Sequence, residues 1–131
     1  MKLKGFILMS ALSLGGFFFL NWQSSRLPAP MPEEAIRGKQ VWQAYNCVSC
    51  HTIFGNGGYV GDDMTTIVNK RSDEELLDFF VNPPVMRPNR QRRHPHVPKE
   101  DAIPLIQYFK FLSSIPTLGW PPKGALTGRR P

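Results

Sequence analysis

The sequence has few side chains that could bind a metal ion and little sign of β-structure. Its 131 residues include two cysteines and three histidines, whereas a structural zinc site needs four ligands at compatible spacing. With both cysteines used, only the histidines would remain, so a zinc site is disfavoured. No strand pattern, phosphate-loop spacing or nucleic-acid motif is evident, so nucleotide or nucleic-acid binding is not indicated. The formal charge of +6 fits acidic protein patches or lipid headgroups as partners instead.

The two cysteines form one motif with a histidine. Cys47-Val48-Ser49-Cys50-His51 is the C-x-x-C-H attachment signal of a c-type haem. Each thiol can add to one vinyl group of the same porphyrin, and the adjacent imidazole can bind the iron. The sequence therefore predicts one covalently attached haem c, held by Cys47 and Cys50, with His51 as the proximal iron ligand.

Two other uses of the cysteine pair are less well supported. A thioredoxin-like dithiol should follow a buried strand in a βαβ pattern, whereas the residues before Cys47 have helical spacing. A disulfide alone would leave a small exported domain without the core that a haem supplies. Haem attachment is therefore the preferred interpretation.

The N-terminus carries a candidate membrane anchor. Lys2 and Lys4 precede an uncharged run at 5–22, and a run of about eighteen residues is near the lower limit for crossing the hydrocarbon layer. A cleaved signal peptide is the alternative, but no A-x-A-like site follows the apolar stretch. The lysines ahead of the span favour a cytoplasmic N-terminus and a periplasmic domain. We expect an anchor at 1–26 in the bacterial inner membrane and a proline-rich linker at 27–32.

The rest of the chain predicts three helices. Acidic residues open the first, at 33–46, whose apolar side chains recur at helical spacing. Ser72 and Glu75 form a capping box that opens a second helix at 72–81. The third is expected at 101–113, because Pro104 is tolerated only where its missing amide falls in the first turn. The expected fold class is mainly α, a class I cytochrome c with an N-terminal transmembrane helix and its haem domain at 33–116.

Glycines and aromatic residues add local expectations. Gly38 lies in the buried stripe of the first helix, where it marks either a close crossing by another helix or a simply tolerated glycine. Four glycines at 54–61 permit positive φ and close passage of the backbone along a haem edge. Trp42, Tyr59 and Trp120 are expected to be packing residues.

The residues alone leave several candidates for the second axial ligand. Methionine sulfur is usual in such folds, and Met64 and Met86 follow the motif. Met64 lies only thirteen positions beyond His51, which leaves little chain to pass round the haem edge to its opposite face. Met86 has more reach, and His94 and His96 lie farther along the chain.

The chain resembles the cytochrome c subunit of bacterial nitric oxide reductase. The resemblance is carried by residues 38–42, 46–52, 55–59 and 113–122, and it covers the anchor and nearly all of the domain. The family's arginine-rich approach to a Met-Pro pair falls on Arg92-Arg93-His94-Pro95. The resemblance therefore implies that His94 stands where the family has its ligating methionine.

An imidazole at this place changes the expected chemistry. Pro95 and Pro98 hold the residues before them in extended geometry, so the ligand loop is stiff. Methionine ligation raises the potential in cytochromes c, so we expect bis-histidine ligation by His51 and His94 and a lower potential than in methionine-ligated relatives. His96 is the second candidate for the distal position and Met86 the third.

The resemblance implies an electron-transfer subunit that is not an enzyme by itself. Such a subunit takes electrons singly from a soluble periplasmic donor. It passes them to a large membrane catalytic subunit of the heme-copper superfamily, which reduces two nitric oxide molecules to nitrous oxide and water. Two protein ligands would leave the iron no open position, and no general base beside a substrate cavity is evident. The alternatives are an electron-transfer subunit of an oxygen reductase or nitric oxide dismutase, and a gas-sensing haem protein.

Two further segments are expected to meet partners. By resemblance, residues 117–131 form a C-terminal tail that packs on the partner subunit. One or two of the arginines around the ligand loop would pair with haem propionates or with an acidic patch on a partner, because the guanidinium fork suits carboxylates. These arginines are Arg87, Arg90, Arg92 and Arg93.

Overall fold

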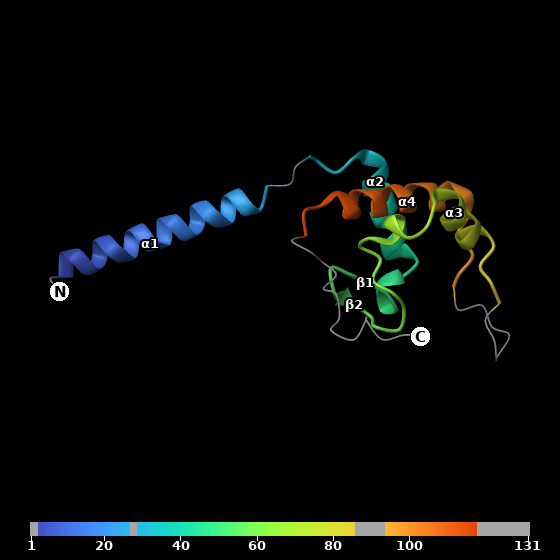
Figure 1. Ribbon diagram of the computed structural model, residues 1–131, viewed down its shortest axis with the longest axis horizontal. Helices are drawn as coiled ribbons and strands as arrows, with labels where there is room; N and C mark the ends of the chain where they lie inside the picture. The colour runs from blue at the N-terminus through green and yellow to red at the C-terminus, as the bar shows by residue number, and fades with distance from the viewer. Residues whose placement is uncertain (1–2, 27–28, 86–93, 118–131) are drawn as a thin grey trace. The chain divides into compact units, whose positions relative to one another are not determined.

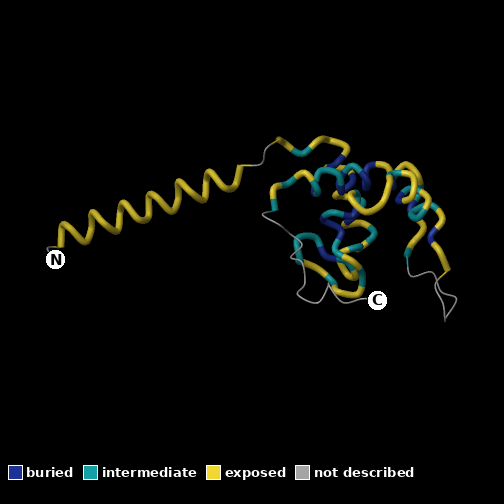
Figure 2. Tube along the Cα trace, in the orientation of Figure 1, coloured by how far each residue is buried: buried dark blue, intermediate teal, exposed yellow. Residues whose placement is uncertain are grey.

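The N-terminal part of the chain forms a long apolar helix. The structure is a computed structural model that describes residues 3–26, 29–85 and 94–117. The chain divides into two units, Met1–Pro30 and Met31–Pro131. The first unit contains α1 (Leu3–Ser24), whose residues are all exposed (Figure 1; Figure 2).

α1 covers the predicted apolar run and extends two residues beyond it at each end. A helix of 22 residues is about 33 Å long, and the hydrocarbon layer is about 30 Å thick. By length and composition, α1 could therefore cross a membrane.

The second unit is mainly helical. Its described elements, in chain order, are α2 (Glu33–Ala44), η1 (Cys47–Ser49), β1 (Thr52–Ile53), β2 (Asn56–Gly57), η2 (Ile67–Asn69), α3 (Asp73–Val81) and α4 (Lys99–Ser114). α2 and α4 cross, and α3 lies beside α4 (Figure 1). The buried residues gather where these helices meet (Figure 2). The described part of the chain thus has the mainly helical fold that the sequence predicted.

Gly38 marks the point where α2 and α4 cross. A Cβ atom there would overlap the carbonyl oxygen of Pro104 and lie 2.8 Å from Cβ of Tyr108. Of the two interpretations of this glycine, close crossing by another helix is the one confirmed. One turn further along α2, Trp42 packs edge-on against Phe109, with ring centroids 5.8 Å apart. The crossing therefore positions the C-terminal end of α2 and, with it, the C-x-x-C-H segment that follows.

The predicted capping box opens α3. The Ser72 hydroxyl accepts from the Glu75 backbone N–H at 3.2 Å, and the Glu75 carboxylate accepts from the Ser72 N–H at 2.9 Å. Lys110 of α4 forms an ion pair with Asp73 in the first turn of α3. α3 is therefore held at its N-terminus both by its own cap and by its neighbour.

Three local expectations were wrong. α2 ends two residues before the predicted position, because Asn46 adopts the left-handed conformation. α4 begins at Lys99 with Pro98 as its cap, so Pro104 is the sixth helical residue and lies beyond the first turn. A proline there removes the bond that its amide would have given to the Glu100 carbonyl and brings its ring close to that carbonyl. A short antiparallel hairpin also forms where no strand was expected: β1 lies just before the glycine-rich run and pairs with β2 inside it.

Candidate haem-binding site

The C-x-x-C-H segment begins where α2 ends. Asn46 has φ 52°, a left-handed conformation in which asparagine is several-fold enriched, and the chain turns there into η1. Cys47 is half-buried against the core, and burial raises the pKa of its thiol. Cys50 is exposed, and the two cysteines form no disulfide with each other. The turn therefore places both sulfur atoms close to His51 in the sequence.

His51 is oriented by the segment that folds back along the motif. Its Nδ1 lies 2.8 Å from the carbonyl oxygen of Asp62. Because a carbonyl can only accept, Nδ1 carries the hydrogen and Nε2 keeps a free lone pair. A Cβ atom on Gly61 would overlap Cε1 of His51 and lie 2.6 Å from its Nδ1. A glycine is therefore needed beside this ring, and the imidazole has the orientation that metal-ligating histidines receive from a second partner.

The Asp63 carboxylate links the β1–β2 hairpin to residues 63–65. Its carboxylate accepts from the Thr52 hydroxyl at 2.8 Å, from the Gly55 N–H at 3.1 Å and from the Thr65 N–H at 2.9 Å. Burial acts to raise the pKa of Asp63, but the hydrogen bonds from Thr65, Thr52 and Gly55 outweigh it and lower this pKa overall. The network fixes Asp62, the neighbour of Asp63, and through its carbonyl the His51 ring.

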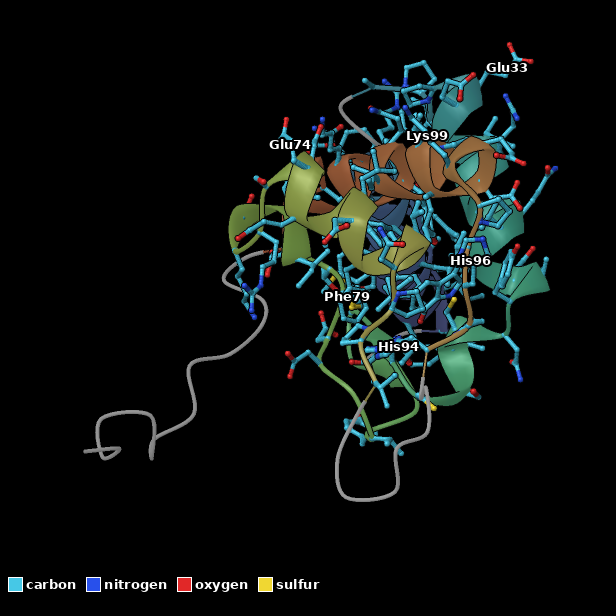
Figure 3. All side chains as sticks on the ribbon, turned by 90° about the vertical axis from the view of Figure 1, so that its right-hand side faces the viewer. Glu33, Glu74, Phe79, His94, His96 and Lys99 are labelled. Atoms are coloured by element: carbon cyan, nitrogen blue, oxygen red, sulfur yellow. The ribbon has the colours of Figure 1, made fainter. Side chains whose placement is uncertain are left out.

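His94 reaches the same place from a distant part of the sequence. Its ring centroid lies 5.7 Å from that of His51, with 37° between the ring planes. Phe79 of α3 packs edge-to-face against His94 at 4.8 Å and 72° (Figure 3). Burial lowers the pKa of His94, and the nearby His51 lowers it further. Both effects favour the neutral imidazole, which is the form that binds a metal ion.

The other candidate ligands that the structure describes, His96 and Met64, lie elsewhere. His96 is exposed, with its Nδ1 2.6 Å from the carbonyl oxygen of Val81, and it lies apart from His94 (Figure 3). Met64 is 8% exposed and belongs to the hydrophobic core, so it is engaged in packing. Met86 lies outside the described residues, as do Arg87, Arg90, Arg92 and Arg93.

The aromatic residues near the motif differ in their roles. Trp42 is buried, with its ring 6.4 Å from that of His51, so its predicted packing role is confirmed. Tyr59 is 83% exposed and donates its hydroxyl to the Gly55 carbonyl at 2.7 Å. The expectation that Tyr59 packs was wrong, because the chain turns back at the surface there. Trp120 lies outside the described residues.

Sequence reasoning missed three residues that support the two histidines. Asp62 acts through its backbone carbonyl, Asp63 through its carboxylate, and Phe79 through its ring. The acidic pair directly after the glycine-rich run is a visible signal, but its spacing alone does not show which carbonyl meets His51. The Phe79 contact depends on how a distant loop returns, and no local pattern reports it.

Comparison with known proteins shows which family the chain belongs to. The cytochrome c family model matches residues 35–109. The C subunit of nitric oxide reductase from Cereibacter sphaeroides is 30% identical over 114 residues, which cover 80% of this chain and 77% of the relative. The chain belongs to this family of c-type cytochromes, the C subunits of nitric oxide reductases. The corresponding protein of Stutzerimonas stutzeri is 29% identical over 98 residues, 70% of this cytochrome and 67% of the relative. Cytochrome c oxidase subunit 2 of Alkalihalophilus pseudofirmus is 23% identical over 103 residues, 72% of this cytochrome and 30% of that protein.

Family membership brings the cofactor and the general role. The cofactor is haem c, covalently attached, and the protein is an electron-transfer subunit and not a catalytic one. The described residues fit this group. Two imidazoles that bind one metal ion from opposite sides, at ordinary metal–nitrogen distances of about 2 Å, would have ring centroids about 6 Å apart. The 5.7 Å between His51 and His94 is close to that value. When bound, the haem supplies a redox-active iron, while the protein holds and orients the groups around it.

Proposed function

We propose that this cytochrome is a membrane-tethered electron carrier that reduces the catalytic subunit of a nitric oxide reductase-type heme-copper enzyme. The carrying observation is the approach of His51 and His94 to 5.7 Å between ring centroids. With an imidazole on each side, the iron would have no open position for a substrate, so the site would suit electron transfer better than bond chemistry. The relatives are named as the C subunits of nitric oxide reductases, which supports the identity of the partner.

In this proposal each residue of the site has one task. Cys47 and Cys50 form the two thioether links, and His51 binds the iron on the proximal side. His94 binds it on the distal side through a neutral ring supported by Phe79. His96 is less suitable, since the ring that meets His51 is that of His94, and His96 lies apart from it (Figure 3).

The proposal places the haem domain on the periplasmic side of the inner membrane. α1 is apolar enough to span the bilayer once, and lysines precede it in the sequence, which favours a cytoplasmic N-terminus. Haem attachment also requires prior export of the domain. We keep the division into an anchor at 1–26, a linker at 27–32, a haem domain at 33–116 and a partner-binding tail at 117–131.

Bis-histidine ligation favours ferric iron, so the potential would be lower than in methionine-ligated relatives. A lower potential gives each electron a larger free-energy drop toward the partner, because ΔG = −nFΔE. It also restricts the soluble periplasmic donor to one of equally low potential. An oxygen reductase is the second candidate partner, favoured by the similarity to a cytochrome c oxidase subunit 2.

Isolation of the native complex tests the identity of the partner. We expect a tag on this chain to co-purify a heme-copper subunit, and the complex to consume nitric oxide when a reductant is supplied through this haem. A complex that consumes oxygen and not nitric oxide would support the second candidate. A large subunit without heme-copper centres would contradict both.

The ligand assignment has its own test. We expect His94→Met to raise the reduction potential and to produce a sulfur-to-iron charge-transfer band. We expect His94→Ala to open the iron to carbon monoxide, while Glu100→Ala, at an exposed position in the first turn of α4, leaves both properties unchanged. If His94→Ala retains the wild-type spectrum and potential, His94 is not the ligand.

A further inference from the structure

The C-terminal turn of α3 is completed by the segment that carries His94. The last four carbonyls of a helix have no partner within the helix. In α3 the Asp78 carbonyl accepts a hydrogen bond from the Asn82 N–H at 2.7 Å. The Phe80 carbonyl accepts from the Val97 N–H at 2.9 Å, and the Val81 carbonyl lies 2.6 Å from Nδ1 of His96. The returning segment therefore supplies two of the donors that the helix end lacks.

The direction of the His96 hydrogen bond follows from its acceptor. A carbonyl cannot donate, so Nδ1 of His96 carries the hydrogen and donates it to Val81. The ring is exposed, and Pro95 and Pro98 restrict the backbone on either side of it. A side chain on a stiff segment loses little conformational freedom when it forms such a bond. His96 is therefore suited to fasten the segment.

The same turn of α3 also contacts His94 directly. Phe79, Phe80 and Val81 are consecutive, and they meet His94, Val97 and His96 respectively. Val97 is only 3% exposed, so its N–H bond to Phe80 is shielded from water. Figure 3 shows His94 beside Phe79, with His96 on a separate part of the same segment. Two points of attachment, at positions 96 and 97, thus follow the His94 ring within three residues.

We propose that His96 is a positioning residue for the distal ligand: its Nδ1–H bond to the Val81 carbonyl holds the segment so that His94 stays on the iron. The inference rests on the proposed ligation by His94. The sequence offered His96 as the second candidate for the distal ligand, whereas here His96 supports His94 in that role. The ligand role is given to His94 because its ring, and not that of His96, lies against His51.

Carbon monoxide binding to the reduced, full-length, haem-loaded protein in detergent measures this role. Carbon monoxide binds only after the distal ligand has left, so at saturating gas the observed rate reports the departure of His94. Loss of one hydrogen bond of ordinary strength corresponds to about a tenfold change. We therefore expect His96→Ala to bind carbon monoxide about tenfold faster than wild type.

Two variants make the comparison specific. His96→Asn keeps an N–H donor at the same number of bonds from Cα as Nδ1, so it should restore a rate close to that of wild type. Ser72→Ala removes the cap at the other end of α3, so it loosens the same helix without touching the segment of His94. We expect its carbon monoxide rate to match that of wild type.

Three results would overturn the proposal. The first is an unchanged rate in His96→Ala. The second is an equal acceleration in Ser72→Ala, which would mean that any loosening of α3 is sufficient. The third is a fast rate in His96→Asn, which would show that the imidazole itself is required and that His96 is the ligand. If wild type binds carbon monoxide as fast as His94→Ala, the proposed ligation by His94 fails, and this inference fails with it.

Discussion

Replacing Gly38 with alanine tests the helix crossing that positions the haem motif. The added methyl group would overlap the Pro104 carbonyl oxygen and lie 2.8 Å from Cβ of Tyr108, whereas ordinary carbon–carbon contact is at about 3.5–4 Å. Neither neighbour can rotate away, because one is a backbone atom and the other is the first side-chain atom. α2 and α4 would have to separate by about 1 Å.

Two effects of this substitution oppose each other. Alanine gains about 1 kcal/mol over glycine in helix propensity. Overpacking costs about 1–3 kcal/mol, and separating the helices also loosens the Trp42–Phe109 contact at about 1 kcal/mol. We expect the packing loss to be the larger effect, with a net destabilisation of about 2 kcal/mol. For a domain of this size, that lowers the melting temperature by about 8–16 °C.

Thermal unfolding of the full-length, haem-loaded protein in detergent, followed by far-ultraviolet circular dichroism, measures this effect. Gln43→Ala is the control, because Gln43 is exposed on the same helix and its substitution should change stability by no more than about 0.5 kcal/mol. A Gly38→Ala protein that melts at or above the wild-type temperature would refute the reasoning.

Three further predictions concern the supports of the site. Gly61→Ala should displace the His51 ring from the Asp62 carbonyl. Loss of that hydrogen bond makes the His51 imidazole less basic, so the reduction potential of the haem should rise. An unchanged potential on redox titration would contradict this. Folding lowers the pKa of Asp63. Its contribution to the free energy of unfolding is therefore complete above its pKa in the unfolded chain, about 3.9, and is lost as the pH falls through its pKa in the folded protein. Wild-type stability in acid denaturation should thus fall more steeply below about pH 4 than that of Asp63→Asn, and parallel curves would count against the network. Ser72→Ala should cost about 1 kcal/mol in denaturant unfolding, and a loss near zero would mean that the capping box is not formed.

Local patterns were enough to predict the elements whose causes are local. The capping box of Ser72 and Glu75 opens α3 as expected, because both partners lie within one turn. α4 begins two residues before the predicted start, because Pro104 lies beyond the first turn to which the sequence confined it. The helix accommodates this proline in its second turn, where the ring is buried and its carbonyl faces Gly38.

The pairing of the two histidines could be predicted only by analogy. The resemblance pointed to His94, but the sequence has no pattern that brings it to His51 across more than forty positions. That approach depends on the end of α3, where Phe79 and the carbonyls of Phe80 and Val81 receive the returning segment. Such contacts form between distant residues, and neither propensity nor hydrophobic spacing encodes them.

The absorption spectrum of the ferric, haem-loaded protein tests the central claim most directly. With imidazoles from His51 and His94 on both sides of the iron, the account predicts a low-spin ferric spectrum without a sulfur-to-iron charge-transfer band. That band should appear only when His94 is replaced by methionine. A wild-type spectrum that already contains the band would assign the distal position to Met86 and contradict the account.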